Sequence, residues 1–107
     1  MTPDSFKRTT RDPAPPGELA AALEALWWAA KGDWNRAHVL VQDDPSREAA
    51  WVHAYLHRVE GDLGNAGYWY RTAGRPAASG SLEVGWDAIA AALLPPEKSK
   101  TTRRDGE

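Results

Sequence analysis

The sequence predicts an all-α domain of about five helices. Apolar residues recur at helical spacing in several separate segments, and the chain is rich in alanine, which has the best helix propensity. Much of its apolar mass lies in six Trp and three Tyr. Because each buried aromatic side chain removes about 150–250 Å² from water, large rings packed among small residues can form a small helical core.

The first two predicted helices are joined by a short turn. The first covers residues 18–31, with its leucines and Trp27 on one face. Gly32 can adopt the left-handed conformation that ends this helix, and Asp33 can cap the next one. The second helix is expected to end in the Asp-Asp-Pro sequence at residues 43–45, because a proline disfavours helix in the residue before it.

The third predicted helix differs from the others. It covers residues 46–60, and Ser46 can serve as its N-cap. Its apolar, aromatic and small residues form three stripes around the helix axis. A helix without a fully polar face is buried on most sides. We therefore expect this helix at the centre of the domain, with the other helices packed around it.

Two further helices complete the domain. Gly61 and Asp62 repeat the closing and capping chemistry, so a fourth helix is predicted from there to Gly74. A fifth helix is expected to begin at Ser81 and to end at the proline pair that starts with Pro95.

Both ends of the chain are predicted to be disordered tails. Residues 1–16 contain four prolines among polar and charged residues, and residues 95–107 open with two prolines and contain no apolar side chain. Hydrophobic periodicity is absent from both segments, and its absence is typical of solvated tails. The predicted helical domain therefore covers residues 17–94.

Composition excludes several functional classes. The chain has no cysteine, which rules out disulfides, thiolate metal sites and a cysteine nucleophile. A net charge of −2 argues against a nucleic-acid partner. The sequence also lacks an apolar run of membrane-spanning length and a signal-peptide pattern, so we expect no membrane contact and a cytoplasmic protein.

The helical hairpin is repeated along the chain. The segments KGDWNRAHVLV at residues 31–41 and EGDLGNAGYWYRTAGRP at residues 60–76 place a Gly-Asp turn before a helix in the same context. Both segments resemble the second helix of a tetratricopeptide repeat. This resemblance implies two stacked helical hairpins followed by a closing helix, and a scaffold that binds a protein or peptide partner, including a second copy of the chain.

A longer string also shows a resemblance. The sequence WVHAYLHRVEGDLGNAGYWYR at residues 51–71 is similar to a pattern in a group of small bacterial proteins. That resemblance implies no particular activity.

The three histidines are predicted to lie close together. His53 and His57 are four residues apart on one helix, so their rings share a face, and His38 lies on the preceding antiparallel helix. Three interpretations follow. The rings are buried and hydrogen-bonded to a hydroxyl, a carboxylate or a carbonyl, they line a small-molecule pocket, or they form a metal or acid–base site.

Other polar residues lie near the turn that follows these histidines. We include Arg58, Glu60, Asn65 and Tyr68 with the three histidines as candidate ligand-binding residues. The simpler interpretation of Arg58 and Glu60 is a solvated ion pair that contributes well under about 1 kcal/mol. Asn65 lies in the first turn of a helix, where a polar residue is common.

Trp28 is the candidate partner contact, because it lies about 100° around the helix from Trp27 and an exposed tryptophan is a frequent interface anchor. Burial beneath the N-terminal tail is the alternative. We assign no catalytic residue, no metal ligand and no cofactor. Zinc proteases use a glutamate directly after the first histidine as a base, and the sequence from His53 to His57 has no glutamate at that position.

Overall fold

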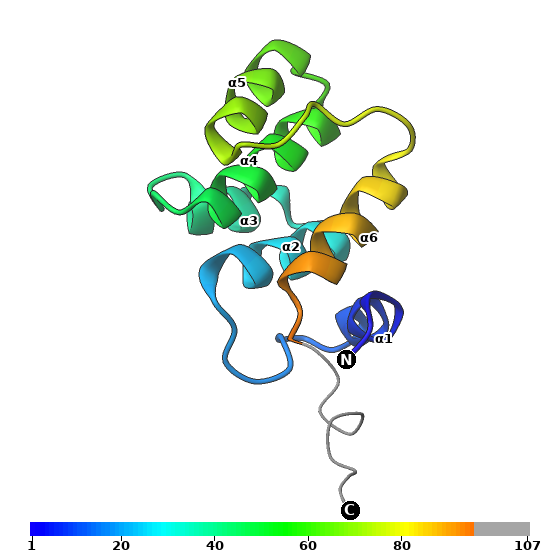
Figure 1. Ribbon diagram of the computed structural model, residues 1–107. Helices are drawn as coiled ribbons and strands as arrows, with labels where there is room; N and C mark the ends of the chain where they lie inside the picture. The colour runs from blue at the N-terminus through cyan, green and yellow to red at the C-terminus, as the bar shows by residue number, and fades with distance from the viewer. Residues whose placement is uncertain (96–107) are drawn as a thin grey trace, which may run out of the picture.

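The computed structural model describes residues 1–95 (Figure 1). These residues contain helices and no strand, which confirms the predicted fold class. All but the first residue of the tail predicted over 95–107 lies outside the described part of the chain. In chain order the elements are α1 (Pro3–Arg8), the 3₁₀ helix η1 (Thr9–Arg11), α2 (Ala21–Lys31), α3 (Trp34–Val41), α4 (Arg47–Glu60), α5 (Leu63–Ala73) and α6 (Leu82–Leu93).

The five predicted helices correspond to α2 through α6. The start of the first was predicted too early, since α2 begins at Ala21 rather than at residue 18. Ala20 has extended backbone angles and acts as the N-cap. Leu19 therefore lies outside the helix, although its side chain still packs against the core.

The turns within the two hairpins, α2–α3 and α4–α5, have the same construction. Gly32 and Gly61 end their helices in the left-handed conformation, with φ of 95° and 87°. Asp33 and Asp62 then cap the next helix, and each side chain accepts a hydrogen bond from a backbone N–H of the first turn. The Gly-Asp chemistry predicted from the sequence is therefore present in both turns.

Helix α4 is the central element of the fold. It packs against α2, α3, α5 and α6, and these helices surround it in Figure 1. Val59 alone departs from the expected apolar stripe on this helix, since its side chain is 42% exposed near the C-terminal end.

Indole rings form much of the core, and their N–H groups find acceptors inside it. Trp86 Nε1 donates to the carbonyl oxygen of Leu26 at 2.8 Å, and Trp27 Nε1 donates to Thr9 Oγ1 at 2.8 Å. These bonds remove the cost of burying an unpaired donor. The largest fully buried side chains are Trp27, Trp86, Phe6, Leu26, Leu56, Ile89, Val41 and Val52.

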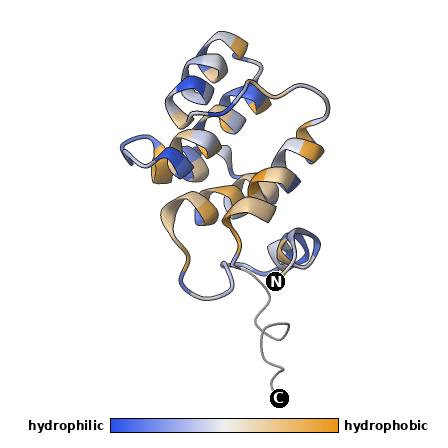
Figure 2. Cartoon of the chain, viewed as in Figure 1, coloured by the Kyte–Doolittle hydropathy of each residue, from blue (hydrophilic) through white to orange (hydrophobic). Residues whose placement is uncertain are grey.

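Hydropathy differs between the two ends of the domain. Figure 2 shows the more hydrophobic colours on α2 and α6 and the more hydrophilic colours on α5. Among the described residues, no helix has both the length and the apolar character that crossing a bilayer requires.

The prediction of a disordered tail over residues 1–16 is wrong for residues 3–11, which form α1 and η1. Thr2 and Ser5 form a reciprocal capping box at the start of α1. The side chain of Phe6 is fully buried and stacks on Trp86, with ring centroids 6.0 Å apart. A buried aromatic residue and a well-capped turn therefore help to dock this segment, which is too short to show periodicity.

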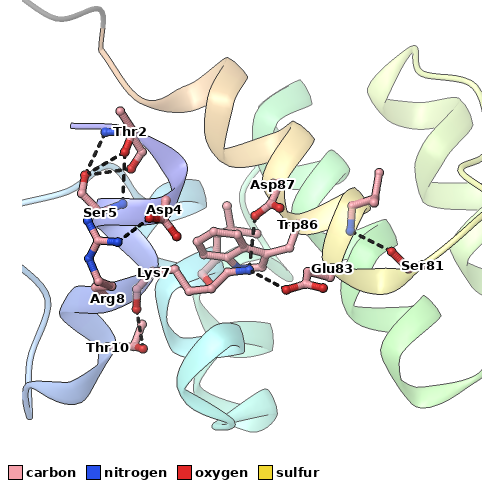
Figure 3. Close-up of polar contacts among 12 residues, drawn as sticks. Thr2, Asp4, Ser5, Lys7, Arg8, Thr10, Ser81, Glu83, Trp86 and Asp87 are labelled. Atoms are coloured by element: carbon pink, nitrogen blue, oxygen red, sulfur yellow. Dashed lines mark hydrogen bonds and ion pairs between the residues drawn. The ribbon is translucent and has the colours of Figure 1, made fainter.

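Charged groups reinforce this docking (Figure 3). The ammonium group of Lys7 lies 3.2 Å from a carboxylate oxygen of Asp87 and 3.8 Å from one of Glu83. It also lies over the ring of Trp86, 4.8 Å from the centroid. Since both carboxylates belong to α6, Lys7 ties α1 to the last helix of the domain.

Replacing Phe6 by alanine should lower the free energy of unfolding by about 3 kcal/mol or more, because the change leaves a cavity against Trp86. Urea denaturation followed by circular dichroism measures this loss. Arg11→Ala, at an exposed position of the same segment, is the control and should change stability by about 0.5 kcal/mol or less. Equal stabilities of the Phe6→Ala and wild-type proteins would show that α1 does not pack on the core in solution.

Candidate functional site

The three histidines lie together between α3 and α4. His38 comes from α3, and His53 and His57 come from successive turns of α4. The Nε2 atoms of His38 and His53 are 3.0 Å apart, and the ring centroids of His53 and His57 are 4.9 Å apart. A set of ring nitrogens, one from each histidine, lies within 4.8 Å of one another. The predicted convergence of the three imidazoles is therefore present.

Two indoles enclose the cluster. Trp34 stacks on His38 with centroids 4.7 Å apart and planes 10° apart, and Trp69 from α5 stacks on His53 at 4.0 Å and 17°. Trp34 Nε1 also donates to the carbonyl oxygen of Leu56 at 2.7 Å, which fixes this ring against α4. His53 is consequently 4% exposed and His57 6% exposed, while His38 is half-buried.

A carboxylate sets the orientation of one imidazole. Glu60 Oε1 lies 2.5 Å from His57 Nδ1. A carboxylate can only accept a hydrogen bond when ionised, so Nδ1 is the donor in this pair. The hydrogen bond thereby leaves Nε2 of His57 as the ring nitrogen available to another partner.

The other two histidines lack the partners expected of structural imidazoles. His38 and His53 bond to each other through their Nε2 atoms, and His53 Nδ1 is buried with no hydrogen-bond partner among the described residues. The simplest expectation for each buried imidazole was a hydroxyl, a carboxylate or a carbonyl partner. Of the three rings, only that of His57 has a carboxylate partner.

Burial favours the neutral imidazole in this cluster. Burial first, and then the neighbouring His38 and His57, lower the pKa of His53 to about 4. The pKa of His38 is also lowered, chiefly by burial and then by His57, against an opposing effect of Glu60. At neutral pH His38 and His53 are therefore uncharged.

Glu60 is the other predicted site residue that joins the histidines. Arg58 turns away, and its guanidinium donates to the carbonyl oxygen of Gly80 at 2.9 Å in the α5–α6 linker. Asn65 is exposed, and its backbone N–H donates to the capping carboxylate of Asp62. The expectation that Arg58 and Asn65 line the same site is wrong. Arg58 follows His57 within α4, about 100° around the helix axis, and so faces the α5–α6 linker, whereas Asn65 lies beyond the turn that ends α4.

Tyr68 lies at the outside of the site. Its side chain is 53% exposed, and its ring meets Trp69 edge-on with centroids 5.0 Å apart. Trp69 therefore separates Tyr68 from the histidines.

Trp28 is not an exposed anchor. It is 6% exposed, because the guanidinium of Arg36 covers its ring at 4.2 Å and its Nε1 donates to Glu24 at 3.1 Å. The expected exposure is therefore wrong. The alternative was that the N-terminal tail buries Trp28. The residue that covers its ring is instead Arg36, which belongs to α3.

The sequence analysis did not include Trp34 and Trp69 among the residues of the site. The four-residue spacing between Trp34 and His38 is a sequence signal that places both rings on one face of α3. Trp69 had no comparable signal, since its contact with His53 depends on how α5 packs against α4.

The chain was compared with protein-family models, with curated proteins and with solved structures, and none of them matches it.

Stability of the metal-free protein should fall as the pH is lowered from about 6.5 to about 4. Unfolded His53 takes up a proton near its ordinary pKa of 6.5, whereas the folded protein keeps this ring neutral until about pH 4. The contribution is complete above pH 6.5 and declines through this window, by up to about 3 kcal/mol.

Urea denaturation in the presence of EDTA at pH 7.5, 5.5 and 4.5 measures this effect. Comparison with His53→Gln cancels the titration of the carboxylates that both proteins share. The stability difference between wild type and variant should shrink as the pH falls. A difference that stays constant over this range would contradict the buried, neutral state of His53.

Proposed function

We propose that this protein binds one divalent transition-metal ion between α3 and α4, with His38, His53 and His57 as its ligands. The observation that carries the proposal is the mutual approach of three imidazoles whose ring nitrogens lie within 4.8 Å of one another. Imidazole is a preferred ligand of Zn²⁺, Ni²⁺ and Cu²⁺.

The spacing of the nitrogens is close to that of a metal site. Zinc binds imidazole nitrogen at about 2.0–2.1 Å, so neighbouring ligands in a tetrahedron are separated by about 3.3 Å. The 3.0 Å separation of the His38 and His53 Nε2 atoms lies near this value. The ligand atom of His57 lies within 4.8 Å of the other two, so it would have to move closer to complete a three-histidine face.

The protonation state of the cluster also favours a cation. Metal ions bind the neutral imidazole, and protons compete with them at low pH. The lowered pKa values of His38 and His53 keep these rings in the ligand form at neutral pH. In a hydrogen bond between two neutral imidazoles the acceptor Nε2 already has its lone pair, so only the donor ring has to move its proton to Nδ1 before both Nε2 atoms can bind a metal.

Glu60 provides the outer-shell contact that metal-bound histidines commonly make. Histidine ligands usually donate their second ring N–H to a carboxylate or a carbonyl, which fixes the ring and raises its basicity. The bond between His57 Nδ1 and Glu60 matches this arrangement. Asp62 lies near the same pair, but its carboxylate already caps α5.

The metal would link the two helical hairpins. His38 belongs to the first hairpin and His53 and His57 to the second, so a bound ion would join α3 to α4. An ion that binds only the folded protein raises its stability in proportion to the logarithm of ion concentration over Kd.

The scaffold role implied by the tetratricopeptide resemblance stays a prediction. Its partner contact was Trp28, and the burial of that side chain removes the surface feature on which the contact depended. The histidine cluster therefore supports metal binding more directly than partner binding.

Titration of untagged, EDTA-treated protein with Zn²⁺ in a calorimeter should show one ion bound per chain at pH 7.5. His38→Gln, His53→Gln and His57→Gln should each weaken binding at least tenfold, because each removes a ligand. Glu60→Gln should weaken it about 10- to 100-fold by removing the outer-shell carboxylate.

Glu48→Gln is the matched control, since it makes the same change at an exposed position near the other end of α4. This variant should bind Zn²⁺ as the wild type does. A folded wild-type protein that binds no stoichiometric ion would refute the proposal, as would histidine variants with unchanged affinity.

A further inference from the structure

Two adjoining cavities lie away from the histidines, where the α5–α6 linker passes over α4. One has a volume of about 250 Å³ and is polar, and the other, of about 230 Å³, is mainly apolar. Trp51 and Arg75 line both cavities. Each volume is below the range of about 300–1,000 Å³ that is typical of ligand pockets, but the two cavities share these two lining residues.

Two arginines without a carboxylate partner mark the polar cavity. Among the described residues, neither Arg47 nor Arg75 forms an ion pair. The guanidinium of Arg75 instead lies over the ring of Trp51, 3.9 Å from its centroid. Glu48 also lines this cavity, so its charged side chains sum to one positive charge. This balance suits an anion with a single negative charge.

The second cavity is open because α5 and α6 do not pack directly against each other in the described part of the chain. The linker and one face of α6 form its walls, including Ala88 and Ile89. Tyr70 lines it from α5, is 3% exposed, and makes no hydrogen bond within the described residues. Its side chain therefore adjoins a space that a ligand can fill.

We propose that the two cavities form one binding site for a small carboxylic acid with an unbranched apolar chain. The carboxylate lies between Arg47 and Arg75, since a guanidinium binds carboxylate oxygens through two parallel hydrogen bonds. The chain passes Trp51 and enters the apolar cavity beside Ile89. This site contains none of the histidines and does not depend on metal binding.

Sodium octanoate is the probe, and its binding to the full-length protein is followed by the indole N–H signals in a two-dimensional NMR titration. The signal of Trp51 should shift with saturation at one octanoate per chain. Acetate, which lacks the chain, and 1-octanol, which lacks the charge, should each bind at least tenfold more weakly. Equal affinity for octanol would refute the proposal by showing that the arginines take no part.

Arg47→Gln and Arg75→Gln should each weaken octanoate binding at least tenfold. Both residues are exposed, so these variants should fold, and circular dichroism checks that they do. Arg71→Gln removes an exposed arginine of α5 that does not line the cavities, and it should leave the affinity unchanged. Affinity that falls equally in all three variants would mean general charge attraction and would overturn the assignment.

Ala88→Leu tests the apolar end, because the larger side chain occupies the space intended for the ligand chain. It should weaken octanoate binding while leaving acetate binding unaffected. Octanoate affinity should be the same with EDTA as with Zn²⁺, which separates this site from the histidine cluster. Absence of octanoate binding to the folded wild type, or an Ala88→Leu variant with wild-type affinity, would refute the proposal.

Discussion

The enclosure of α4 by four other helices is the constraint on which the rest of the structure depends. Because almost every face of this helix is covered, its polar side chains must find partners inside the protein rather than in water. His53 and His57 lie on a covered face, and the partners within reach are another imidazole, two indoles and one carboxylate. The chemistry of the site therefore follows from the packing of the fold.

Large rings among alanines make this enclosure possible in a chain of 107 residues. Small residues let α5 approach α4 closely, as Ala54 and Ala66 do where they meet Tyr70. The indoles fill the remaining volume, and the N–H groups of Trp27, Trp34 and Trp86 donate to carbonyl or hydroxyl oxygens. The core thus combines a large apolar contact area with few unpaired polar atoms.

The two proposed sites use different faces of the same helix. The histidine face meets α3 and is closed by the ring of Trp69, whereas Trp51 faces the cavities beneath the α5–α6 linker. The first site holds the neutral rings of His38 and His53, and the second holds arginines that have no carboxylate partner within residues 1–95. They therefore differ in the sign of the charge that each would attract.

Local sequence signals predicted the helices and much of the site. The Gly-Asp turns, the Ser46 cap and the spacing of His53 and His57 act over a few residues, so their structural consequences can be read from the sequence. The same reasoning failed at the N-terminus. A short, proline-rich segment has too few residues to show periodicity, and the docking of Phe6 depends on Trp86 in the last helix.

By itself, therefore, the sequence determined the positions of α2 to α6, the central place of α4 and the approach of the three histidines. The tertiary structure decided which side chains cover others, since Arg36 covers Trp28 and Trp69 covers His53. It also decided that α1 packs against α6 and that Arg58 bonds to the α5–α6 linker rather than to the site. The physical reason is that helix spacing determines the direction of a side chain relative to its own axis, whereas burial depends on neighbours that are distant in sequence.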